Sequence, residues 1–238
     1  MSPGRADPGL AALEAEVTNC RRCPRLVAWR EQVAYEKRAS FKSDTYWGRP
    51  IPGFGDPRAR VLILGLAPAA HGANRTGRVF TGDRSGDFLF ASLHRTGFAN
   101  QPTSVSRDDG LQLTGAWITA AVRCAPPANK PTPDERDRCL PWTVAELEHV
   151  DRVRVVVCLG AFAWDAALRL RAALGHAPPR PKPKFGHGTL WYDDEREARG
   201  WALLGTYHPS QQNTFTGVLT EAMLDDVFTT ARQVAGLA

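Results

Sequence analysis

Chemically useful side chains gather in the stretch VLILGLAPAAHGANRTGRVFTGD, residues 61–83. Its apolar start is typical of a strand buried on both faces, and the glycine-rich remainder is typical of a ligand loop beyond the carboxyl end of such a strand. The loop offers one carboxylate, Asp83, together with His71, Asn74 and the aromatic Phe80. Asp83 suits catalysis and also suits the N-cap of the helix expected next, and the two roles are compatible. Phe80 is either a packing residue or, facing the crevice, a platform on which a planar base stacks.

The same loop excludes several familiar nucleotide-binding and hydrolase motifs. A P-loop needs Lys and then Ser or Thr after its second glycine, whereas Gly82 is followed by Asp83 and Arg84. No G-x-G-x-x-G follows a strand, and neither G-x-S-x-G nor H-E-x-x-H occurs. The crevice therefore belongs to another class of ligand.

A second polar cluster, YHPSQQN at residues 207–213, follows the last of the expected core strands. The carboxyl ends of parallel strands meet at one edge of a sheet, so His208 is expected to face Asp83 across a shared ligand. A single histidine is usually structural. At the end of a core strand, followed by Ser, Gln, Gln and Asn, it is more in keeping with a functional role.

The cysteines form the third group. Cys20 and Cys23 make a C-x2-C pair, and Cys124 and Cys139 are separated by fourteen residues. Four thiolates suit either a zinc ion or an iron–sulfur cluster, and the spacing does not choose between them. The alternative is that the four cysteines are unrelated. This alternative is weaker, because C-x2-C pairs are uncommon by chance. Cys158, within VVVCLG, is expected to be a small buried side chain.

The elements that must position these residues alternate along the chain. Short β-rich runs predict core strands at residues 60–66, 116–122, 153–159 and 201–207, with a further edge strand at 189–192. Helical patterns cover residues 10–17, 25–37, 86–96, 134–150, 161–174 and 220–235. This order predicts a parallel sheet with right-handed crossovers, in a three-layer α/β/α sandwich. Thr132 and Glu135 form a capping box for the helix that starts at Pro133.

Three loops are long, at residues 45–57, 100–113 and 177–188. Loops of this length are usually functional or mobile. The Pro- and Lys-rich loop 177–188 is either a solvated surface or a phosphate contact. We expect residues 1–9 to be flexible and residues 10–238 to form one domain.

The composition is that of an ordinary globular protein with a basic bias. The formal charge is +5 and the isoelectric point is about 9.1, which favours a negatively charged partner such as nucleic acid. No stretch approaches the roughly 20 apolar residues that span a bilayer, and the start lacks the apolar core of a signal peptide. We therefore expect a cytoplasmic protein with thiols or metal ligands and without a disulfide framework.

In combination, GLAPAAHGANRTGRVFTGD, ITAAVRCAPPANKPTP, HPSQQN and the four cysteines closely resemble family 5 uracil-DNA glycosylases, the UdgB type, from Cys20 to the final helix. The resemblance implies an α/β/α fold with a four-stranded parallel sheet. It also implies a [4Fe-4S] cluster held by Cys20, Cys23, Cys124 and Cys139, so the choice of iron over zinc rests on analogy.

The resemblance also implies an activity. Such enzymes flip uracil out of double-stranded DNA, hydrolyse its glycosidic bond and leave an abasic site, and they accept other deaminated bases such as hypoxanthine and xanthine. The matching motifs include no lysine nucleophile, so backbone cleavage is not expected. The leading hypothesis is thus a monomeric, monofunctional base-excision enzyme without a diffusible cofactor.

Specific residues take roles by the same resemblance. Sister families have a polar or acidic residue where this chain has Ala67, which leaves Asp83 to activate water or to stabilise the oxocarbenium-like sugar. His208 would donate a hydrogen bond to uracil O2, while Asn129 contacts the base and Phe80 stacks on it. The remaining candidates are His71 and Asn74 in the pocket, Ser85 and Ser210 on phosphates, and Gln211, Gln212 and Asn213 in the vacated stack.

Two rival functions come from other classes. A non-catalytic damage-binding module would keep the pocket without the chemistry, and Asp83 and His208 discriminate against it. A zinc-dependent hydrolase is disfavoured because four thiolates leave no open coordination position on the ion.

Overall fold

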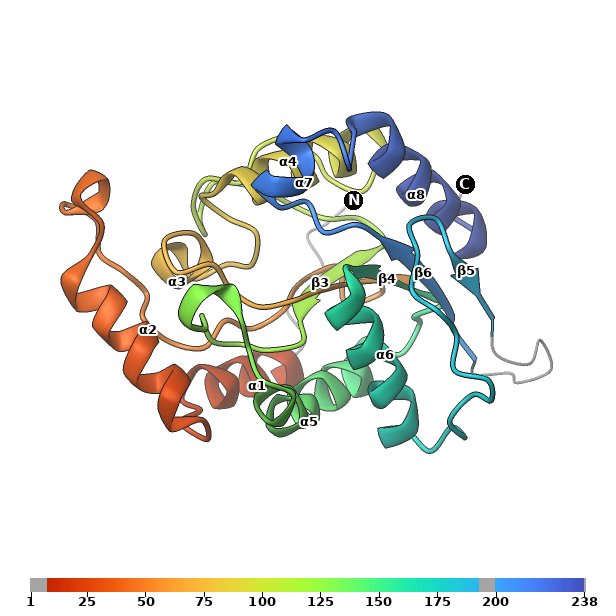
Figure 1. Cartoon of the computed structure of the whole chain (residues 1–238), viewed down its shortest axis with the longest axis horizontal. Coiled ribbons are helices and arrows are strands. Elements are labelled where there is room, and N and C mark those ends of the chain that lie inside the picture. Colours follow the sequence, from red (N-terminus) through yellow and green to blue (C-terminus); the bar gives the residue numbers. More distant parts are fainter. Residues whose placement is uncertain (1–7, 193–199, 238) are drawn as a thin grey trace.

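A six-stranded sheet in the order β1-β3-β2-β4-β6-β5 forms the centre of the molecule (Figure 1). The structure is a computed structural model and describes residues 8–192 and 200–237. Its four central strands are parallel and buried along their whole length: β3 (Ala116–Ala120), β2 (Val61–Gly65), β4 (Val155–Leu159) and β6 (Ala202–Thr206). The predicted four-stranded parallel core is therefore confirmed.

Two short antiparallel strands extend this core at its edges. β5 (Leu190–Trp191) pairs with β6, in agreement with the expected edge strand, and β1 (Phe54–Gly55) pairs with β3. β1 falls in a segment interpreted from the sequence as a loop. Two residues give no alternation of apolar and polar side chains, so the pattern contained no signal for it.

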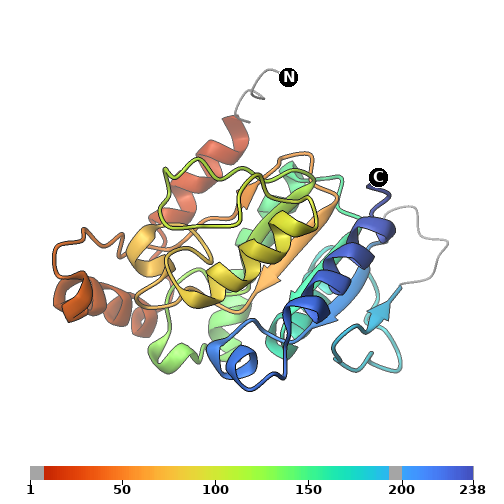
Figure 2. The same ribbon diagram turned by 90° about the horizontal axis from the view of Figure 1, so that it is seen from above.

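Helices cover both faces of the sheet and complete the three layers (Figures 1 and 2). α4 (Arg84–Arg95) and α8 (Glu221–Val234) pack on one face, in a core with Ile63, Val157 and Leu204. α5 (Pro133–His149) and α6 (Ala161–Ala173) cover the other face, whose core includes Trp164 and the buried Cys158, as expected. The capping box of Thr132 and Glu135 at the start of α5 is also confirmed.

The N-terminal part adds α1 (Pro8–Thr18) and α2 (Pro24–Glu36), followed by the short helix η1 (Ala39–Phe41). α2 and η1 project beyond the three layers, and we refer to residues 24–42 as the arm (Figures 1 and 2). The expectation for residues 1–9 falls mostly outside the described residues, which begin with α1. In the part of the chain that the structure describes, no helix is long and apolar enough to cross a membrane.

Three further short helices stand near the carboxyl ends of the parallel strands: α3 (Ala73–Thr76), η2 (Pro127–Asn129) and α7 (Gln211–Phe215). They follow β2, β3 and β6 respectively. The loops that hold the candidate residues are thus brought to one edge of the sheet.

Candidate active site

A cavity of about 540 Å³ opens at the carboxyl ends of the parallel strands, between the loops that follow β2, β3 and β6. This volume lies within the range of small-molecule sites, roughly 300–1,000 Å³. Its apolar wall consists of Leu66, Ala67, Pro68, Ala69, Val79, Phe80 and Ala120, and its polar groups are Asp83, Ser85, Asn129, His208, Ser210, Gln211 and Gln212. Nine residues singled out from the sequence therefore meet in one place: Ala67, Phe80, Asp83, Ser85, Asn129, His208, Ser210, Gln211 and Gln212.

Asp83 is fixed by the start of α4. Its Oδ1 accepts a hydrogen bond of 2.9 Å from the backbone N–H of Gly86, so it is the N-cap expected from the sequence. Burial raises the pKa of Asp83, while the N–H groups of Gly86 and Ser85 oppose that rise. A Cβ at Gly72 would lie 2.0 Å from Oδ2 of Asp83, so only glycine leaves room for this carboxylate.

Phe80 faces the cavity from a strained turn. Its backbone φ of +51° is rare for a residue with a side chain. The ring lies against Gly65, where a Cβ would come within 2.8 Å of Cε2, and its centroid is 6.0 Å from that of the His208 imidazole. Phe80 therefore lines the cavity beside the histidine and also packs against the core that includes α4 and α8.

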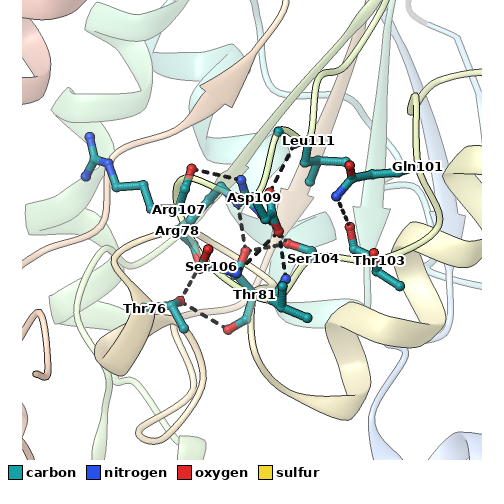
Figure 3. Close-up of polar contacts among 12 residues, drawn as sticks. Thr76, Arg78, Thr81, Gln101, Thr103, Ser104, Ser106, Arg107, Asp109 and Leu111 are labelled. Carbon is teal, nitrogen blue, oxygen red and sulfur yellow. Dashed lines mark hydrogen bonds and ion pairs between the residues drawn. The ribbon is translucent and has the colours of Figure 1, made fainter. Parts of the chain in front are cut away.

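A buried polar network braces the turn that holds Phe80 (Figure 3). Arg78 forms an ion pair of 2.7 Å with Asp109 and donates hydrogen bonds to the hydroxyls of Ser104 and Thr81. Ser104 also accepts a hydrogen bond from the N–H of Gly82 through its carbonyl oxygen. Burial alone would raise the pKa of Asp109, but Arg78 and backbone N–H groups lower it to about 2. The long loop 100–113 is thus the support for the cavity wall.

His208 follows β6, two residues after the strand ends at Thr206, and lines the same cavity. Burial lowers its pKa to about 4, so the imidazole is neutral near pH 7 and one of its ring nitrogens carries hydrogen. Asn213 donates a hydrogen bond of 2.9 Å from Nδ2 to the carbonyl oxygen of His208. Ser210 caps α7 by accepting from the N–H of Asn213. These contacts fix the backbone that presents the ring.

Asn129 reaches the cavity from η2, after β3. Both Ala128 and Asn129 have a positive φ, of 52° and 54°. Such a conformation is several-fold enriched for asparagine and costly for alanine. The turn places the amide of Asn129 at the junction of the cavity and a second groove, which both include it.

Three of the candidate residues lie away from the cavity. His71 lines the neighbouring groove, where its Nδ1 is 3.1 Å from the Tyr46 hydroxyl. Asn74 is fully buried in α3 and donates to the carbonyl oxygen of Arg30, so its amide does not face the cavity. Asn213 supports His208 from behind, as described above. Arg78 and Asp109 carried no local sequence signal, because 31 positions separate them.

The four cysteines of the sequence pattern meet on the other side of the molecule from α4 and α8. Cys20 and Cys23 lie between α1 and α2, Cys124 follows β3, and Cys139 is in α5; all are free thiols. Together they line a single small cavity with apolar side chains, including that of Trp142, and with three arginines, Arg22, Arg123 and Arg138. Among residues 8–192 and 200–237, no three His, Cys, Asp or Glu side chains are grouped as for a single metal ion.

Hydrogen-bond donors point at two of these sulfurs. The guanidinium of Arg30, which is 2% exposed, donates from Nη1 to Cys124 Sγ over 2.9 Å. The backbone N–H of Arg123 donates to Cys139 Sγ over 3.3 Å. As thiols these two cysteines are strongly protonated, because burial raises the pKa of Cys124 to about 11 and that of Cys139 to about 12.

The three-layer fold is that of the uracil-DNA glycosylase class, and comparison with known families agrees. The sequence pattern of the uracil DNA glycosylase superfamily matches residues 52–232, so the chain belongs to that superfamily. It is therefore an enzyme, a hydrolase that acts on N-glycosyl bonds. The resemblance seen in the sequence is confirmed at the level of the family.

Known proteins with similar sequences indicate which type of uracil-DNA glycosylase the chain is most similar to. The chain is 57% identical to the type-5 uracil-DNA glycosylase of Mycobacterium bovis over 96% of its own length and 82% of the relative's. It is 51% identical to the type-5 enzyme of Thermus thermophilus, over 93% and 96% of the two chains. A type-4 uracil-DNA glycosylase of Archaeoglobus fulgidus is 29% identical over 67% and 70%.

Proposed function

We propose that this protein removes uracil, and also hypoxanthine and xanthine, from double-stranded DNA by hydrolysing the N-glycosidic bond of a flipped nucleotide and leaving an abasic site. The observation that carries the proposal is the convergence of Asp83, Asn129 and His208 on one cavity beside the Phe80 ring. A base must leave the stack to reach such a recessed site, and extraction costs a few kcal/mol. We infer that residues 10–238 act as one domain and as a monomer in the cytoplasm.

In this proposal the base occupies the apolar part of the cavity. Phe80 stacks on one face of the base, and the Asn129 amide hydrogen-bonds to its polar edge. The small side chains of Ala67, Ala69 and Ala120 in the wall leave room for a purine as well as for uracil, which supports the broad substrate range. Gln211 and Gln212 at the rim are placed to fill the vacated position in the duplex, and Ser85 and Ser210 to contact phosphates.

Cleavage of the glycosidic bond requires stabilisation of the charges that develop on the base and on the sugar. As the base leaves, negative charge develops on it, and the neutral His208 retains one ring N–H that can donate to O2. Positive charge develops on the sugar, where the Asp83 carboxylate either stabilises it directly or activates the attacking water. No other carboxylate lines the cavity in the part of the chain that is described.

Cys20, Cys23, Cys124 and Cys139 are proposed to hold a [4Fe-4S] cluster. Three observations support the fit: all four line one cavity, none is in a disulfide, and buried donors from Arg30 and Arg123 point at the sulfurs of Cys124 and Cys139. Donors of this kind stabilise cluster-bound thiolates. When bound, the cluster supplies a cross-link between the N-terminal segment and the loop after β3.

The test compares the wild type with Asp83→Asn on duplex oligonucleotides that contain uracil, hypoxanthine or xanthine, followed by alkaline cleavage at abasic sites. Asparagine is as good an N-cap as aspartate, so the helix start survives while the charge is lost. We expect excision to fall by about 10²- to 10⁴-fold. The matched control is Asp151→Asn, an exposed carboxylate before β4, at the opposite end of the sheet from the cavity.

Each outcome decides a part of the proposal. Absence of cleavage by the wild type on every base, with binding retained, would support the damage-binding alternative. Wild-type activity in Asp83→Asn would remove Asp83 from the mechanism. Excision of uracil alone would restrict the substrate range.

A further inference from the structure

A groove of about 720 Å³ continues from the base cavity toward the arm. The groove and the cavity share Ala69, Asp83, Asn129 and Gln211. The groove adds Arg38 and Phe41 from the arm, and Arg84 from the first turn of α4. A nucleotide whose base enters the cavity would therefore have neighbouring nucleotides at the mouth of this groove.

The end of the arm bears three positively charged side chains, those of Lys37, Arg38 and Lys42. In the described part of the chain, Lys37, Arg38 and Lys42 form no ion pair with Asp or Glu. Lys37 donates instead to the backbone carbonyl oxygen of Lys42, and Lys42 donates to that of Glu36. Beside them Tyr35 is 88% exposed. Exposed cations beside an aromatic side chain are typical of a surface that binds nucleic acid.

The arm is also held at a fixed place relative to the active-site loop, and Arg75 makes the connection. Its guanidinium lies 4.0 Å from the Phe41 ring, pairs with Asp44 at 2.8 Å and donates a hydrogen bond to the carbonyl oxygen of Gly82, next to Asp83. Burial lowers the pKa of His71, which lines the groove, and the positive charges of Arg38 and Arg75 lower it further.

We propose that the arm is a second DNA-binding surface, on which Arg38 and Lys42 bind the phosphate backbone of the duplex on one side of the damaged nucleotide. The proposal rests on the proposed function of the cavity. Cations that are already free of carboxylate partners bind phosphate without first breaking an ion pair. Phosphate contacts of this kind position the duplex and do not read its sequence.

The experiment uses single-turnover excision of uracil by the full chain, measured against enzyme concentration at several KCl concentrations. For Arg38→Gln/Lys42→Gln we expect the half-saturating concentration to rise by about tenfold and the slope of its logarithm against log[KCl] to fall by about two. The rate at saturation stays at the wild-type value, because the cavity is unchanged. The matched control is Arg152→Gln, an exposed arginine before β4, at the opposite end of the sheet.

Wild-type protein provides an independent measurement with duplexes shortened on either side of the uracil. Removal of the part of the duplex that contacts the arm is expected to raise the half-saturating enzyme concentration for the wild type. The same removal should have no further effect on the double variant. An unchanged salt slope in the folded double variant would overturn the proposal. Should that variant misfold, wild-type insensitivity to both shortenings would overturn it. A wild type that releases no uracil would contradict the function of the cavity instead.

Discussion

Arg78 beside the active site and Arg30 beside the cysteines are both buried arginines, with 6% and 2% of their side chains exposed, but their partners differ. Arg78 meets the Asp109 carboxylate at 2.7 Å. Arg30 meets a cysteine sulfur and the carbonyl oxygen of Cys20, and the nearest carboxylate, that of Glu31, is 3.8 Å away and half-exposed. A buried charge costs several kcal/mol unless it is compensated.

The difference separates two kinds of region. The wall of the active site contains its own counter-charge, so it is complete as a folded protein. The cysteine region holds a cation that thiolates around a bound cluster would balance. The two regions should therefore respond differently to the loss of a single side chain.

The largest effect is expected for Cys139→Ala. Loss of a proposed cluster ligand should remove the iron and lower the free energy of unfolding by more than about 4 kcal/mol. Iron and sulfide content together with denaturant unfolding would measure both. The matched control is Cys158→Ala, because Cys158 is buried in β4 away from the cysteine cavity and should keep its iron. Full iron content in Cys139→Ala would contradict the proposed ligand set.

Asp109→Asn should destabilise the active-site wall without touching the iron. Breaking a buried ion pair by removing one charge costs about 3–5 kcal/mol, and we expect about 3 kcal/mol because asparagine still accepts hydrogen bonds. Excision should slow as the turn that holds Phe80 loosens. Denaturant unfolding, iron content and the single-turnover rate, measured on one preparation, would test these three expectations. Loss of iron would contradict the separation of the two regions.

Arg30→Gln should affect the other region, and its first effect should be on the cluster. A hydrogen bond from a charged donor contributes about 1.5–3 kcal/mol, so we expect a stability loss of about 2 kcal/mol with reduced iron retention. The cluster's absorbance during incubation with a chelator would report the retention. Retention equal to that of the wild type would show that Arg30 does not support the cluster.

The smallest effect concerns pH. The pKa of His208 is lowered from 6.5 to about 4, so protonation favours the unfolded chain. The associated stability is present above pH 6.5 and is lost as the pH falls toward 4, by about 1–2 kcal/mol once partial exposure is allowed for. Unfolding at a series of pH values should give a flatter profile for His208→Gln, and identical profiles would contradict a depressed pKa.

The sequence predicted the core strands and their flanking helices to within about two residues, because strands buried on both faces read as short continuous apolar runs and the helices between them have a helical pattern. It also placed Asp83 and His208 together, because parallel strands end at one edge. Asn74 shows the limit of the approach. Its position in a polar loop suggested the pocket, but the four-residue helix α3 turns it inward, and so short an element has no period to detect. The helix predicted at residues 25–37 is confirmed as α2, but η1 and the contact between Arg75 and Phe41 correspond to no local pattern.

The contact between Gly65 and the ring of Phe80 links two positions that are fifteen residues apart in this chain. A methyl group at position 65 would come within 2.8 Å of the ring, and the backbone φ of Phe80 is +51°. An alanine at position 65 would therefore require the Phe80 ring to shift, whereas a smaller residue at position 80 would leave room for the methyl group. Variants designed to reshape this pocket should change the two positions together.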